Sequence, residues 1–210
     1  RDKGKNQELG EELIGIVAEG PKGRLFLPPS EEQIIAAKTK KPANCPSAPI
    51  PDQALGFRVQ LYGMNNFDEL FTDRQLTALT TFSELLPLVR EEVKKDAHSV
   101  HFDDDNCHLR DGGKKITAYA EAITVYLSML IDQISNQSST LCSWHVNNIQ
   151  MKSTFSRQSL PMVWDYAESN VFCSSSGSYN NMLKCMIQAL NNFKQINSGF
   201  AYQHNAMTPY

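Results

Sequence analysis

The stretch KKITAYAEAITVYLSMLIDQ, Lys114 to Gln133, decides the fold class. Its apolar residues recur at spacings of three and four, which is the period of an α-helix. One stripe consists of Ile116, Tyr119, Ile123, Leu127, Leu130 and Ile134, with Ala118, Ala122, Val125 and Met129 beside it. A helix that is apolar over more than half of its circumference is surrounded by other elements. The stretch therefore predicts the central helix of a mainly helical protein.

A second long helix is predicted upstream, in the stretch FTDRQLTALTTFSELL from Phe71 to Leu86. Thr72 followed by Gln75 has the form of a capping box, which marks the start of a helix. The apolar stripe that follows consists of Leu76, Leu79, Phe82, Leu86, Val89 and Val93. We expect Pro87 to kink or split this helix, because its ring clashes with the preceding turn.

The remaining elements are shorter. Residues 13–29 form two β-rich runs around Pro21, Lys22 and Gly23, which predicts a β-hairpin with about four connecting residues. Ser30 and Gln33 predict a short capped helix, and a linker follows that contains four prolines, at 42, 46, 49 and 51. Residues 57–64 alternate as a strand does, and helices are expected near 154–169 and 179–193. The predicted fold class is α+β, predominantly α-helical: an N-terminal β-hairpin or small sheet followed by about four to five helices.

Composition favours one domain over residues 1–210, with a β-rich portion and proline-rich linker in 1–64 and a helical portion in 65–210. The net charge of −3 argues against binding nucleic acid through bulk electrostatics. The five cysteines include no Cys-x-x-Cys spacing, which favours a reducing, cytoplasmic setting over a disulfide framework. No apolar run approaches the roughly 20 residues that span a bilayer, so no membrane partner is expected. The chain starts without methionine, which suggests a piece of a longer protein.

The loop HFDDDNCHLRDGG, His101 to Gly113, contains residue types that bind metals. A calcium loop that starts at Asp103 would need glycine at its sixth position and glutamate at its twelfth, where this chain has His108 and Lys114. The spacing therefore favours a solvated acidic loop between two helices, and no metal ligand is predicted.

The sequence also predicts no catalytic residue in this chain. Cys142, Trp144 and His145 in STLCSWH could be a nucleophile and a base, but nothing local supplies an orienting third group or an oxyanion hole. A buried cysteine beside an aromatic is the favoured interpretation. A glycine-rich phosphate loop is likewise lacking.

The stretch TFSRQSLPMVWDYAESN, Thr154 to Asn170, is the most informative for function. On a helix from Arg157, its polar residues would face away from the apolar side, and a loop rich in hydroxyl and amide groups follows. The alternative is an amphipathic helix whose tryptophan packs and whose arginine forms a surface ion pair. We expect Arg157 to be partly exposed and near the 174–177 loop, with Arg74 the more structural arginine. The predicted substrate-binding residues are Arg157, Gln158, Trp164, Asp165, Asn170, Ser175 and Ser176.

Five strings, in this order, resemble the central region of the large adenine-specific DNA methylases that contain a zinc-ribbon module and often accompany phage-defence genes. They are GFRVQLYGM, LFTDRQLTALTTFSELL, AYAEAITVYLSMLID, STLCSWH and TFSRQSLPMVWDYAESNVFCSSSGSY. The similarity extends from about Leu13 to Leu190. The chain departs from the family at Val171, where proline is usual, and Cys45 falls in a variable segment.

The resemblance implies a central domain of an S-adenosylmethionine-dependent DNA adenine methyltransferase, inactive alone, that shapes the DNA or catalytic cleft. The family's cofactor motif lies upstream of this region, its zinc ribbon follows that motif, and its Asp-Pro-Pro-Tyr catalytic motif comes downstream. None is in this chain: Pro28-Pro29 is flanked by Leu27 and Ser30, and the run 208–210 lacks the acidic or amide residue. The cofactor would therefore bind the parent enzyme and not this fragment. The alternative is a structural helical module that binds a protein partner, such as another defence protein.

Overall fold

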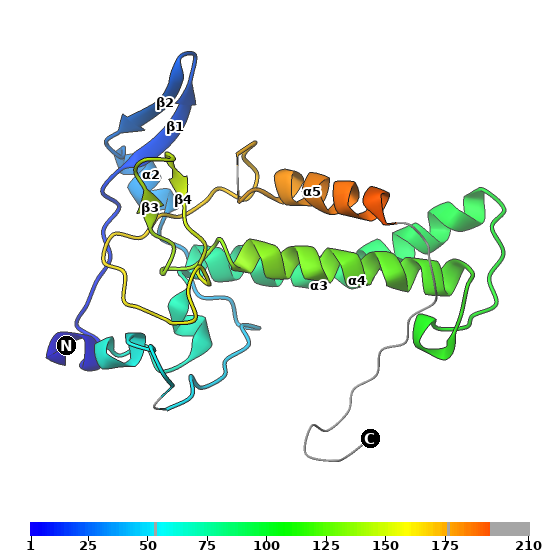
Figure 1. Ribbon diagram of the computed structural model, residues 1–210, viewed down its shortest axis with the longest axis horizontal. Helices are drawn as coiled ribbons and strands as arrows, with labels where there is room; N and C mark the ends of the chain where they lie inside the picture. Colours follow the sequence, from blue (N-terminus) through cyan, green and yellow to red (C-terminus); the bar gives the residue numbers. More distant parts are fainter. Residues whose placement is uncertain (53, 176, 194–210) are drawn as a thin grey trace.

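Two long helices, α3 (Asp73–Ser99) and α4 (Ile116–Ser135), lie side by side at the centre of this computed structural model (Figure 1). The structure describes residues 1–52, 54–175 and 177–193. Helix α5 (Tyr179–Asn192) packs on α4, and a β-hairpin lies at the N-terminal end of the chain. These elements confirm the predicted α+β, mainly helical fold class.

The predicted central helix is present, because α4 supplies the buried residues that join the three helices. Leu130 and Ile134 are 1% and 0% exposed, and they form a core cluster with Val171. The partly buried residues around this cluster come from α3, α4 and α5: Ala78, Leu79, Phe82, Leu127, Tyr179, Met182, Leu183 and Met186. The rings of Phe82 and Tyr179 stack with centroids 5.1 Å apart, which ties α5 to α3.

Helix α3 begins with the predicted capping box. Thr72 accepts a hydrogen bond from the backbone N–H of Gln75 at 3.2 Å, and the Gln75 side chain accepts one from the N–H of Thr72 at 2.9 Å. Of the two outcomes predicted for Pro87, a split is wrong because α3 is continuous across it, and a kink stays a prediction. Pro87 lies on the exposed face, where water can satisfy the carbonyl group that loses its intrahelical partner.

The N-terminal hairpin consists of β1 (Ile16–Gly20) and β2 (Gly23–Leu27), paired antiparallel from Ile16↔Leu27 to Gly20↔Gly23. Its connection contains two residues, Pro21 and Lys22, and not the four or so predicted. The short helix α2 (Glu31–Ala36) follows and has the expected capping box of Ser30 and Gln33. A second, smaller hairpin, which the sequence did not predict, pairs β3 (Trp144–His145) with β4 (Gln150–Met151).

The prediction of a strand at residues 57–64 is wrong. The segment forms the short helix η1 (Val59–Tyr62), which ends at Gly63 with a φ of 94°. Val59 is fully buried, in a second core cluster with Ile50, Leu70, Leu141 and Leu160. A Cβ atom at Gly63 would clash with the backbone of Gly4 in helix α1 (Asp2–Lys5). Turn geometry and this close contact therefore outweigh the alternation of apolar residues.

Two further short helices complete the described elements, η2 (Phe67–Leu70) and η3 (Leu109–Asp111). Asp68 of η2 is buried and accepts hydrogen bonds from Lys41 at 2.5 Å and Ser47 at 2.6 Å. This network fixes the proline-containing linker against the start of α3. Among the described residues, no helix is both long and apolar enough to cross a membrane.

Candidate functional site

Residues 154–178, which connect β4 to α5, include all seven predicted substrate-binding residues. The prediction of a helix at 154–169 is wrong: no residue of this span is helical. The backbone instead pairs with residues 136–143. The N–H of Thr154 donates to the carbonyl of Asn136 at 2.7 Å, and the N–H of Ala167 donates to that of Cys142 at 2.7 Å.

Buried residues anchor this connection at intervals. Thr154 is 6% exposed and its hydroxyl lies 2.7 Å from that of Ser139. Leu160 is 1% exposed, and its carbonyl accepts a hydrogen bond from the N–H of Arg58 at 2.9 Å. Val171, at 8% exposure, belongs to the core cluster of the three helices. The segment therefore has a defined conformation without being a helix.

Between the anchors, several predicted site residues lie on the surface. Arg157, Gln158, Asp165 and Asn170 are exposed, and the Trp164 side chain is 65% exposed. Trp164 packs edge-on against Tyr62, with ring centroids 5.4 Å apart. A surface tryptophan held by one aromatic neighbour keeps most of its indole available for contact.

The predicted exposure of Arg157 is confirmed, although no helix begins there. Within the described part of the chain, Arg157 makes no ion pair with Asp165 or Glu168, the carboxylates of the same segment. Nor does a hydrogen bond join Arg157 to the described residues of the 174–177 loop. Its proximity to that loop stays a prediction.

Arg74 is the more structural arginine, as expected. Its guanidinium donates to both carboxylate oxygens of Glu168, each at 2.8 Å, and also to the carbonyl of Ala37. The hydroxyl of Thr72 donates to the same carboxylate at 3.1 Å. The hydrogen bonds from Arg74 to Glu168 raise the pKa of the guanidinium. Arg74 therefore links the end of α2 and the start of α3 to Glu168 of the 154–178 segment.

Tyr166 provides another long-range link. It bridges to Ser143 and its hydroxyl donates to Glu11, near the N-terminus of the chain. Burial of the ring, together with this hydrogen bond, raises the pKa of the phenol well above its usual range. Sequence reasoning did not select Tyr166, because its partner lies far away along the chain.

The loop before α5 uses its polar groups mainly for its own conformation. The side-chain oxygen of Asn170 accepts from the N–H of Phe172 at 2.9 Å, and the hydroxyl of Ser175 lies 3.0 Å from the sulfur of Cys173. Ser178 is fully buried and caps α5 by accepting from the N–H of Asn181. Ser176 lies outside the described residues. Of the predicted loop residues, Asn170 and Ser175 thus have structural partners within the loop.

The other two motifs behave as structural features. Cys142 is fully buried, as expected, and contacts Thr154 and Ser139. Asp104 of the acidic loop accepts hydrogen bonds from the N–H and hydroxyl of Thr117, and so caps the first turn of α4. Desolvation would raise the pKa of Asp104, but these hydrogen bonds hold it below its ordinary value. No group of three or more potential metal ligands gathers among the described residues.

Comparison of the chain with protein-family models, curated proteins and solved structures found no match.

Proposed function

We propose that this chain is the central domain of an S-adenosylmethionine-dependent DNA adenine methyltransferase, in which it shapes the surface that receives DNA. The sequence resemblance names the class of enzyme. The structural observation that supports it is the exposure of Arg157 and Trp164 on a segment that buried anchors hold in place. The cofactor and the catalytic motif would belong to other parts of a longer protein.

The two side chains suit a nucleic-acid substrate. A guanidinium without an internal anion can bind a backbone phosphate bidentately, and an exposed indole can stack on an unpaired base. Glu168 is already bound to Arg74, so its carboxylate does not compete with a phosphate for Arg157. Asp165 and Gln158 flank these groups on the same surface segment and can orient them by contacts with a bound strand.

The test is methylation of adenine in DNA by the longer enzyme that carries Arg157→Ala or Trp164→Ala. We expect each change to lower activity at least tenfold. Arg157→Ala should leave the unfolding temperature unchanged because its side chain is exposed, and Trp164→Ala should lower it only slightly, through loss of the contact with Tyr62. Lys95→Ala and Val146→Ala are matched controls, since these side chains are 75% and 76% exposed and belong to α3 and the 145–150 turn. Wild-type rates in both site variants would contradict the assigned roles.

A second candidate function is a helical module that docks a protein partner, such as a phage-defence protein. The observation that favours it is Phe172, which is 77% exposed beside Phe82 of α3, with ring centroids 6.1 Å apart. Exposed apolar groups of this size mark surfaces that other proteins cover when they are contiguous. A defined complex that requires Phe172, together with unchanged methylation by the Arg157 and Trp164 variants, would favour this function.

A further inference from the structure

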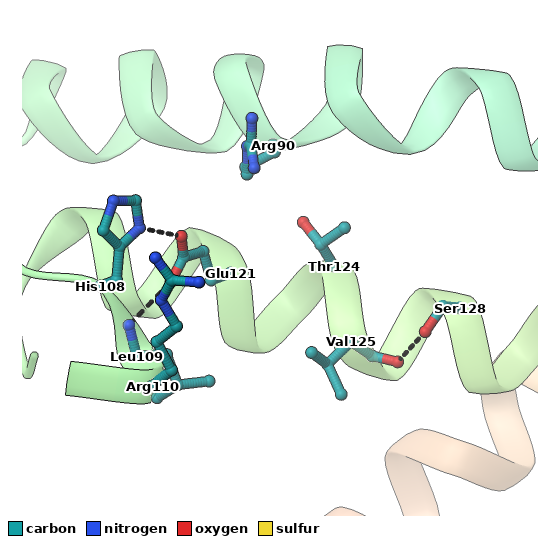
Figure 2. Close-up of a pocket in the computed structure, with 8 residues that line it drawn as sticks. All are labelled: Arg90, His108, Leu109, Arg110, Glu121, Thr124, Val125 and Ser128. Carbon is teal, nitrogen blue, oxygen red and sulfur yellow. Dashed lines mark hydrogen bonds and ion pairs between the residues drawn. The ribbon is translucent and has the colours of Figure 1, made fainter. Parts of the chain in front are cut away.

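A pocket at the η3 end of the helical pair is separate from the 154–178 segment. It has a volume of about 480 Å³ and is lined by Arg90, His108, Leu109, Arg110, Glu121, Thr124, Val125 and Ser128. Figure 2 shows Arg90 projecting from α3 and His108, Arg110 and Glu121 lying opposite it beside α4. Pockets of roughly 300–1,000 Å³ are the usual size for small ligands.

The two arginines keep most of their donor groups available. Arg90 uses its Nε in a 3.4 Å contact with Glu91, and the Nε of Arg110 lies 3.7 Å from Asp111. Among the described residues, the terminal amino groups of both guanidiniums have no hydrogen-bond partner. Two planar groups with free donors, on opposite walls, suit an anion with several oxygens better than a single carboxylate.

The carboxylate in the pocket is already occupied on both oxygens. Glu121 accepts a hydrogen bond from Nδ1 of His108 at 2.5 Å and one from the N–H of Leu109 at 2.7 Å. The His108 contact, followed by that of Leu109, lowers the pKa of Glu121. This arrangement fixes the imidazole ring and leaves its Nε2 available to a ligand.

The rest of the lining is apolar or internally bonded. Leu109 and Val125 are partly exposed apolar side chains, whereas the hydroxyls of Thr124 and Ser128 donate to backbone carbonyls of α4 at 2.8 and 2.7 Å. A ligand that fits this lining has an anionic group that binds the arginines and a flat or apolar body that packs on Leu109 and Val125.

We propose that this pocket binds a small phosphorylated molecule of mononucleotide size, with its phosphate between Arg90 and Arg110. Glu91 and Asp111 lie 3.4 and 3.7 Å from the two arginines, and their negative charge disfavours a long polyanion more than a single phosphate group. The occupant is therefore a free phosphate ester and not a nucleic-acid backbone. The site does not depend on the proposed methyltransferase role.

Calorimetric titration of the 210-residue chain at low ionic strength tests the site. The probes are AMP, adenosine, inorganic phosphate and a short single-stranded oligothymidylate. We expect AMP to bind, adenosine to bind at least tenfold more weakly, and Arg90→Ala or Arg110→Ala to weaken AMP at least tenfold. Ser128→Asp, which adds a carboxylate to the pocket lining, should also weaken AMP binding at least tenfold. Lys95→Ala on the same helix is the charge-matched control and should change affinity less than twofold.

Backbone amide shifts on AMP addition should be largest at residues 108–110 and 121–128. The proposal is overturned if neither AMP nor phosphate binds at millimolar concentration, if adenosine binds as tightly as AMP, or if both arginine variants bind like the wild type. Oligothymidylate that binds more tightly than AMP through the same arginines would also overturn it, because the occupant would then be nucleic acid. Circular dichroism identical to the wild type ensures that a variant's loss of binding is not a loss of folding.

Discussion

At the scale of single residues, Thr72 has two separate interactions at the start of α3. Its hydroxyl oxygen accepts the capping hydrogen bond from Gln75 and donates to Glu168, and the residue is 5% exposed. We expect Thr72→Ala to lower the free energy of unfolding by about 1–2 kcal/mol, mainly through loss of the cap. Urea denaturation measures this change. Thr72→Ser keeps the hydroxyl and should retain most of the stability, and an equal loss in both variants would contradict the capping role.

Asp68 gives the protein a predictable dependence on acid. Burial alone would raise its pKa, but hydrogen bonds from Lys41 and Ser47 hold the pKa below its ordinary value of 3.8. A depressed pKa in the folded state contributes stability that is complete above the ordinary value and is lost as the pH falls through the folded value. The stability lost on Asp68→Asn should therefore be constant at neutral pH and shrink below about pH 4.

Urea unfolding of both proteins from about pH 7 to about pH 2.5 measures this dependence. The control is Asp103→Asn, since the Asp103 side chain is 86% exposed and pairs only loosely with Lys115 at 3.7 Å. Its stability should differ little from that of the wild type, because the side chain is exposed. If the stability difference between the wild type and Asp68→Asn instead grew on acidification, the pKa of Asp68 would not be lowered in the folded state.

At the scale of elements, Arg74 and Glu168 fasten the 154–178 segment to α3. Their side chains are 27% and 26% exposed, so solvent screens the pair only in part. A double-mutant cycle with Arg74→Met and Glu168→Gln should give a coupling energy of about 1 kcal/mol. The exposed pair Lys95 and Glu92, at 75% and 62%, is the reference and should couple by a few tenths of a kcal/mol. Equal coupling energies in the two cycles would mean that the Arg74–Glu168 pair stabilises the protein no more than an exposed surface pair does.

Periodicity and capping predicted the helices well, because the signals for α3, α4 and α5 lie within each helix. Thr72, Gln75 and the α4 stripe needed no knowledge of distant residues. The errors at 57–64 and 154–169 have the opposite cause. There the backbone bonds to partners far along the chain, such as Arg58 to Leu160 and Thr154 to Asn136, and these contacts outweigh the local pattern.

The same distinction applies to the candidate sites. The exposure of Arg157 and the more structural role of Arg74 were predicted, but the partners of Arg74, Glu168 and Ala37, were not, because they lie far away along the chain. The pocket of Arg90, His108 and Glu121 was not predicted, because it combines residues of α3, α4 and the loop between them. The spacing of residues along the sequence does not show that Arg90 of α3 and His108 line the same pocket.

At the scale of the whole molecule, the 154–178 segment contributes one buried residue to each of the two core clusters. Leu160 belongs to the core cluster around Val59, and Val171 belongs to the core cluster of the three helices. We therefore expect one cooperative unfolding transition, with Leu160→Ala and Leu130→Ala each costing about 2–5 kcal/mol and shifting that transition as a whole.

Thermal unfolding followed in parallel by circular dichroism and by tryptophan fluorescence tests this expectation. The helical signal reports mainly on α3, α4 and α5, whereas Trp144 and Trp164 lie in the non-helical part of the chain. Coincident midpoints in both variants are the expected result. Midpoints that separate, with each variant affecting one signal alone, would instead divide the chain into two units.

The hairpin β1–β2 also determines how the protein behaves in concentrated solution. Among the described residues its strands pair only with each other, so both outer edges retain free backbone N–H and C=O groups, beside a Phe26 side chain that is 64% exposed. Open edges of this kind promote self-association, and the charged pair Glu19 and Arg24 across the strands opposes it. Aggregation measured by light scattering should therefore rise with concentration, faster in Arg24→Ala and more slowly in Phe26→Lys. The concentration at which the purified protein begins to aggregate would therefore depend on the few charged residues of the β1–β2 hairpin.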